Sequence, residues 1–64
     1  MKRFSPGQLI VSSIPYREDR KPILVLSAVL NEDKETWTVE FVRGMKVVTS
    51  RMHPGSWTLL QDLT

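Results

Sequence analysis

The chain has 64 residues, of which 41% are hydrophobic and 25% are charged, and its formal net charge is +2. This balance is typical of a small globular domain and excludes a disordered chain. Because the sequence has no cysteine and a single histidine, it excludes disulfide bracing and argues against a structural zinc site. We therefore expect one domain over residues 1–64, with no metal and no cofactor.

Short runs of β-branched and aromatic residues, separated by proline, glycine and charged residues, predict β-strands rather than helices. The first predicted strand, residues 8–14, follows a Pro6-Gly7 turn. A charged loop over residues 15–22 separates it from the second strand, residues 23–30. This second strand is apolar on both faces, which predicts the central strand of a sheet.

The second half of the chain predicts three more strands. Residues 36–42 alternate between apolar and polar positions, as a half-buried antiparallel strand does. Arg43-Gly44 predicts a tight turn, because glycine adopts a positive φ freely, and residues 45–52 form the returning strand. The sequence HPGS then ends this strand and predicts a turn before a short last strand over residues 57–60.

Five short strands joined by one long loop and tight later turns predict an all-β fold. Closure of such a sheet into a small barrel would remove the exposed edges that a flat sheet has. The order of the loop lengths favours a small five-stranded SH3-like barrel, and an OB-like barrel is the alternative.

The longest apolar-rich run, residues 22–30, is far shorter than the roughly 20 residues of a membrane-spanning helix. The N-terminal MKRFSPGQ is not followed by the apolar region of a signal peptide. We expect a cytoplasmic protein without a membrane partner.

Acidic residues are concentrated in one segment. Residues 31–35, NEDKE, hold three of the seven acids and one of the nine bases, which leaves four acids and eight bases elsewhere. The sequence thus predicts an acidic tip opposite a basic body, and a basic body suits phosphates or an acidic protein.

The stretch PGQLIVSSIPYREDRKPILVLSAVLN (6–31) and the strands up to residue 50 resemble the N-terminal half of the PemK/MazF toxin family, which are SH3-like ribonucleases. The resemblance implies a barrel and RNA cleavage, with Lys21 where the family has an arginine and Thr49 where it has a threonine. An arginine-like cation would stabilise charge on the scissile phosphate. Two departures are that lysine lacks the bidentate geometry of arginine and that this chain has no counterpart of the family's C-terminal helices.

Two groups of side chains are candidates for binding. The long first loop combines an aromatic ring with three cations, which suits base stacking and phosphate contacts; these residues are Tyr16, Arg17, Arg20 and Lys21. Its two acids make a merely solvated loop the alternative. The second group surrounds the predicted hairpin and consists of Arg43, Lys46 and Arg51. Alternation places Lys46 and Arg51 on opposite faces unless a bulge intervenes, so one basic stripe is not predicted.

The run SRMHPGSW, residues 50–57, contains the only histidine and one of two tryptophans. His53 is a candidate phosphate contact or general base, but the neighbouring sequence shows no nucleophile, and a polar turn residue is the alternative. Trp57 either packs under the open end of the barrel or presents its ring to a partner.

These patterns predict a binding module without catalytic residues, associated with nucleic acid or a nucleic-acid-bound protein. The alternative is a protein-interaction adaptor or inhibitor of the phage or mobile-element type, acting on a host protein. A trimmed PemK/MazF-like ribonuclease is a second alternative. Homodimerisation is compatible with all three, because so small a chain gains from additional buried surface.

Overall fold

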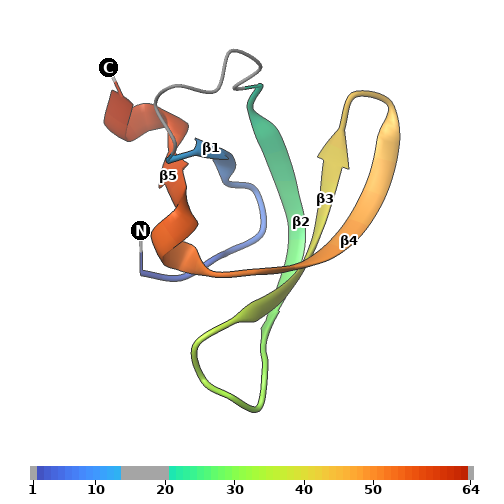
Figure 1. Cartoon of the computed structure of the whole chain (residues 1–64). Helices are drawn as coiled ribbons and strands as arrows, with labels where there is room; N and C mark the ends of the chain where they lie inside the picture. The colour runs from blue at the N-terminus through green and yellow to red at the C-terminus, as the bar shows by residue number, and fades with distance from the viewer. Residues whose placement is uncertain (1, 14–20, 64) are drawn as a thin grey trace.

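The computed structural model describes residues 2–13 and 21–63 and shows one antiparallel sheet in the order β4-β3-β2-β1-β5 (Figure 1). The strands are β1 (Leu9–Ser12), β2 (Ile23–Leu30), β3 (Trp37–Arg43), β4 (Lys46–Met52) and β5 (Trp57–Leu59). Two 3-10 turns flank β5, namely η1 (Pro54–Ser56) and η2 (Leu60–Leu63). The prediction of an all-β fold with five strands is confirmed, and β2 is the central strand.

Only the strand predicted over residues 23–30 has the boundaries of the structure. The strands predicted over 36–42 and 45–52 are Trp37–Arg43 and Lys46–Met52. The first strand begins at Leu9 and ends at Ser12, and residue 14 of the predicted range lies outside the described residues. The last strand ends at Leu59, because Leu60 already starts η2. Within residues 2–13 and 21–63 no ladder joins β4 to β5, so the sheet is open in its hydrogen bonding.

The β3–β4 hairpin has the geometry that its sequence predicts. Arg43 and Lys46 are its closing pair, and Gly44 has a φ of 65°. A glycine at the first of two central positions is typical of a type II′ turn, which matches the twist of the strands. The register then runs without interruption to the Trp37–Met52 pair.

The central strand β2 is not a regular strand. Its register to β3 shifts between Val25 and Ser27, which marks a β-bulge at Leu26. Because of the bulge, Val25 and Ala28 both face the core, where they lie opposite Phe41 and Val39. The alternation of the sequence would have placed these two β2 side chains on opposite faces.

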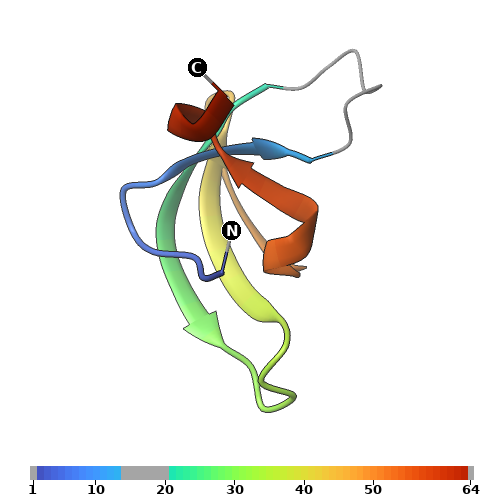
Figure 2. The ribbon, with the colours of Figure 1, turned by 90° about the vertical axis from the view of Figure 1, so that its left-hand side faces the viewer.

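The core lies on the inner face of the long strands, where β1 and β5 cover β2 and β3 on one side (Figures 1 and 2). Its fully buried side chains are Phe4, Ile10, Val25 and Val39. Each contributes about 1.5–3 kcal/mol through burial. The rings of Phe4 and Trp37 meet edge to face at 6.2 Å, and Trp37 packs against the core as its alternating position predicts.

Candidate binding surface

The predicted binding residues of the first loop are only partly described. Tyr16, Arg17 and Arg20 lie outside the described residues. Lys21 is exposed and lies two residues before the first residue of β2. Leu24 and Val47 both pair with Val42, so they lie at the same height along the strands. Lys21 is three residues before Leu24 and therefore lies at the height of the β3–β4 turn.

Arg43 and Lys46 pair with each other on either side of the β3–β4 turn, and both side chains are exposed. Together with Lys21 they make one end of the long strands basic. The acidic β2–β3 turn, which contains Glu32, Asp33 and Glu35, lies at the opposite end (Figure 1). The strand topology therefore separates the basic and acidic segments along the length of the sheet.

Arg51 belongs to the acidic end. Its Nη2 donates to Asp33 Oδ2 at 2.7 Å, and its Nε donates to Thr36 Oγ1 at 2.9 Å. Because Arg51 pairs with Thr38 and Lys46 with Arg43 in an unbroken ladder, the two β4 cations point to opposite faces. The exposed Arg51 side chain is thus paired with Asp33 and Thr36 and does not form a stripe with Lys46.

Asp33 organises the turn to which Arg51 is tied. Its Oδ1 accepts hydrogen bonds from the backbone N–H groups of Thr36 at 2.9 Å and Glu35 at 3.0 Å. These backbone bonds, followed by those from the Thr36 hydroxyl and Arg51, hold the pKa of the Asp33 carboxyl well below its usual range. The carboxylate is thereby charged and already hydrogen-bonded.

His53 and Trp57 form the corner between β4 and β5. The Nδ1 of His53 accepts a hydrogen bond from the Gly55 N–H at 2.9 Å and so caps η1. Trp57 is half-buried and packs against the core. Both side chains contribute to the structure of the corner.

The sequence did not reveal an apolar row across the outer face of the sheet. Leu9 lies opposite Leu24, which lies opposite Val42, which lies opposite Val47. Directly opposed residues project to the same face of an antiparallel sheet. Val42 is half-buried, while the exposed fractions of Leu9, Leu24 and Val47 are 47%, 37% and 62%. We call these four residues the outer apolar row.

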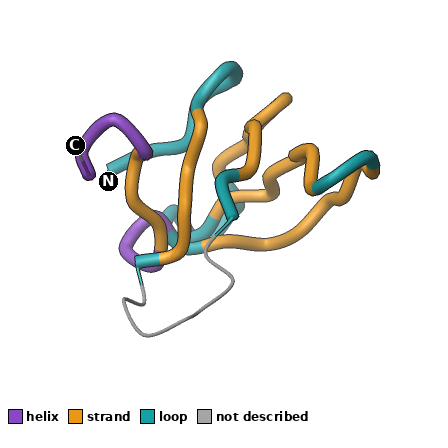
Figure 3. Tube along the Cα trace, turned by 90° about the horizontal axis from the view of Figure 1, so that it is seen from above, coloured by secondary structure: helices purple, strands orange, loops and turns teal. Residues whose placement is uncertain are grey.

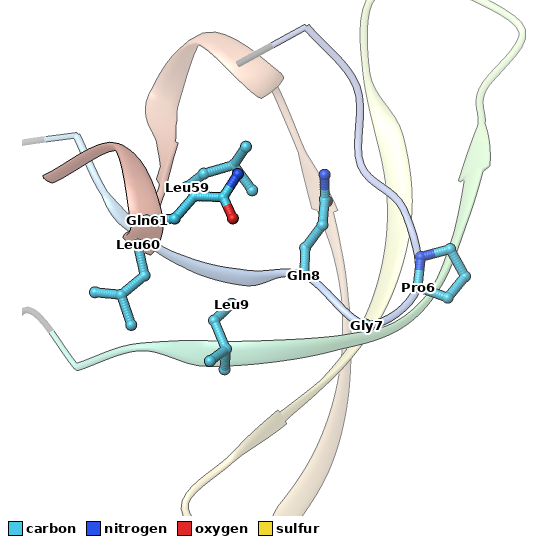
Figure 4. Close-up of a pocket in the computed structure, with 7 residues that line it drawn as sticks. All are labelled: Pro6, Gly7, Gln8, Leu9, Leu59, Leu60 and Gln61. Atoms are coloured by element: carbon cyan, nitrogen blue, oxygen red, sulfur yellow. The ribbon is translucent and has the colours of Figure 1, made fainter. Parts of the chain in front are cut away.

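A pocket of about 700 Å³ adjoins one end of this row (Figure 4). It lies between the segment that leads into β1 and the start of η2, and Leu9 belongs to both the pocket and the row. The lining residues are Pro6, Gly7, Gln8, Leu9, Leu59, Leu60 and Gln61. Three leucine side chains give the pocket an apolar wall, while Gln8 is held by a hydrogen bond from the Ser5 N–H to its Oε1 at 2.7 Å.

The described residues contain no group of three or more potential metal ligands. Among the same residues, every buried side-chain nitrogen and oxygen has a hydrogen-bond partner. Lys21 and Thr49 are the positions of the PemK/MazF resemblance. Leu24 and Val47 lie at the same height along the strands, because both pair with Val42. Lys21 is three residues before Leu24, and Thr49 is two residues after Val47, so they lie at different heights. The register thus separates them by about five residues, roughly 16 Å of strand.

None of the helical turns in the described part of the chain is long and apolar enough to span a membrane. No protein-family model, no curated protein and no solved structure matches this chain.

Proposed function

We propose that this protein is a small non-enzymatic binding module that recognises a protein partner through the outer apolar row and its adjoining pocket. The observation that carries this proposal is the register that aligns Leu9, Leu24, Val42 and Val47 across four strands. Single exposed apolar residues are common on protein surfaces, whereas a continuous apolar patch marks an interaction site.

The surroundings of the row indicate the chemistry of the partner. Arg43 and Lys46, both exposed, are the chain neighbours of Val42 and Val47 at the hairpin, and alternation places them on the other face of the strands. Leu9 leads at the other end into the leucine-lined pocket. A protein segment with apolar side chains complements the row and the pocket, since the removal of apolar surface from water drives most protein association.

We also infer that the five strands form an SH3-like barrel. In support, β1 pairs with both β2 and β5, and the 3-10 turn η1 lies between β4 and β5. This connection brings the two ends of the strand order near each other in the chain. A small sheet that curls in this way protects its core without additional elements.

A second candidate function is nucleic-acid binding, which is favoured by the basic end formed by Lys21, Arg43 and Lys46. Cations at one end of a small domain attract phosphates, and the resulting affinity falls steeply with salt. Gel-shift titrations at low and moderate salt test this function. A salt-dependent shift that is lost in Lys46→Glu would support it, and no binding at low salt would exclude it.

The protein-binding proposal is tested by affinity capture with wild type, Leu24→Glu and the matched control Val29→Glu. Both residues lie on β2 and are exposed, but Val29 lies outside the row. We expect a nuclease-resistant protein partner that binds wild type and the control. With the purified partner, Leu24→Glu should lower the affinity at least about tenfold, as loss of a central apolar contact does.

Circular dichroism establishes that both variants remain folded before their binding is compared. Equal loss of binding in Leu24→Glu and Val29→Glu would contradict the role of the row. Capture that disappears on nuclease treatment would instead support the nucleic-acid function.

A further inference from the structure

The two edges of the sheet differ in their protection. The β5 edge has only three residues, all half-buried, and lies between the helical turns η1 and η2, drawn in purple in Figure 3. The β4 edge has seven residues, and Lys46 through Arg51 are all exposed. Its register to β3 is uninterrupted, and it contains no proline or glycine. Its only charged residues, Lys46 and Arg51, lie near its two ends, so the stretch between them is a template for pairing with another strand.

The hairpin geometry determines which backbone groups of β4 face outward. In a two-residue hairpin the closing pair, here Arg43 and Lys46, exchanges both backbone hydrogen bonds, and hydrogen-bonded pairs then alternate along the ladder. The other N–H and C=O groups of β4 therefore point away from β3. They belong to Val47, Thr49 and Arg51.

We propose that the β4 strands of two copies of this chain pair antiparallel, with Thr49 on the twofold axis. Only outward-facing residues can exchange backbone hydrogen bonds in such a ladder, and the residues between them form its non-hydrogen-bonded pairs. Since Thr49 is both outward-facing and the middle residue of Lys46–Met52, this register pairs the whole strand with its copy. This interface goes beyond the proposed recognition of a protein partner and does not depend on it.

The side chains fit this register. Thr49 faces Thr49 of the second copy, a favourable β-branched pair, and Val47 faces Arg51 of that copy. Lys46 faces Met52, so no two like charges are directly opposed. Centring the ladder on Arg51 would oppose two arginines, and centring it on Val47 would run into the Gly44–Met45 turn.

The assembly closes at two copies. The two β4 strands pair with each other across the twofold axis, so neither edge remains open. The outer edges of the resulting ten-stranded sheet are then the two short β5 strands. These are flanked by η1 and η2 and do not offer a comparable template. The interface is thus isologous, and a filament is not expected.

A charge pair at the axis tests the proposal. Light scattering coupled to size exclusion should give the wild type a mass of twice 7.4 kDa. Thr49→Lys and Thr49→Glu each oppose like charges at the axis and should be monomeric, whereas their equimolar mixture should restore the dimer. Val29→Lys, at a position on β2 that is also exposed, is the matched control and should remain dimeric.

Amide hydrogen exchange gives a residue-specific measurement. In the dimer the amides of Val47, Thr49 and Arg51 should exchange slowly, and in Thr49→Lys they should exchange quickly while those of Val48 and Ser50 stay protected. Three results would overturn the proposal: a wild type that is monomeric up to about 1 mM, a dimer that persists in both Thr49 variants, or rapid exchange at Val47, Thr49 and Arg51 in a dimer. Because Leu24 is unchanged in these variants, failure here leaves the proposed partner surface to its own test.

Discussion

The two edge strands, β5 and β4, differ in how much they contribute to the packed core and how much they expose to solvent. Strand β5 has three half-buried residues, and two of them, Trp57 and Leu59, pack against the core. Strand β4 has seven residues, of which only Met52 is buried. The comparison teaches that the shorter edge is anchored by packing, while the longer edge is held mainly by its ladder to β3 and is accessible to other molecules.

The largest test of this comparison is Ile10→Ala. Ile10 is 0% exposed and pairs with both Ile23 and Leu59, so it joins the β5 edge to the central strand. Truncating it should cost about 2–5 kcal/mol of unfolding free energy. Val47→Ala on the β4 edge should change it by less than about 0.5 kcal/mol. Urea denaturation followed by circular dichroism measures both, and similar losses would contradict the division.

A middle-sized effect is expected at the contact between β5 and the end of β1. The hydroxyls of Ser13 and Thr58 lie 2.8 Å apart in a part-buried hydrogen bond. Thr58→Val removes this bond at nearly constant shape and should cost about 0.5–1.5 kcal/mol. The same change at exposed Thr49 on β4 is the matched control. A double-mutant cycle with Ser13→Ala measures the coupling, and strict additivity would show that the hydrogen bond contributes nothing.

A smaller effect, visible as a change with pH, is expected where β4 is tied to the β2–β3 turn. The depressed pKa of Asp33 means that its stabilising contribution is present above the unfolded pKa of about 3.9 and is lost as the pH falls below it. The melting temperature of the wild type should therefore fall with acidification. Asp33→Asn should flatten that dependence, and Glu32→Gln, an exposed neighbour, should leave it intact. Parallel pH profiles for wild type and Asp33→Asn would refute this role.

The smallest expected change in unfolding free energy is at an exposed position of β4. Val47→Thr keeps a β-branched side chain at a position that is 62% exposed. It should alter the unfolding free energy by less than about 0.5 kcal/mol. If the outer apolar row binds a partner, the same variant should weaken that binding, as a titration with the purified partner would reveal. A stability loss as large as that of Thr58→Val would show that β4 contributes more packing than its exposure indicates.

Several local features follow directly from neighbouring residues. The alternation of Trp37, Val39 and Phe41 predicted a strand with one buried face, as observed. Gly44 predicted the tight hairpin turn. Pro54 and Gly55 predicted the corner, which the structure shows as the 3-10 turn η1. Each depends on φ preferences or on the period of a strand, and both are encoded within a few residues.

The candidate surface was not predictable in the same way. The sequence directed attention to cations and aromatic rings, yet Arg51 is tied to Asp33, and Trp57 packs against the core. The outer apolar row went unseen because its members come from four strands and depend on pairing such as Leu9 with Leu24. The bulge at Leu26 also changes which β2 side chains share a face, and alternation alone does not reveal it.

The sequence by itself determined that this protein is all-β, that it has five strands, and where most of its turns lie, because these properties arise from local backbone preferences and the two-residue period. Only the tertiary structure decided the strand order, the pairing of Ile10 with Leu59, and the exposure of β4. The physical reason is that pairing between distant segments is chosen by burial of the whole core. Which edge stays exposed is then a consequence of that choice.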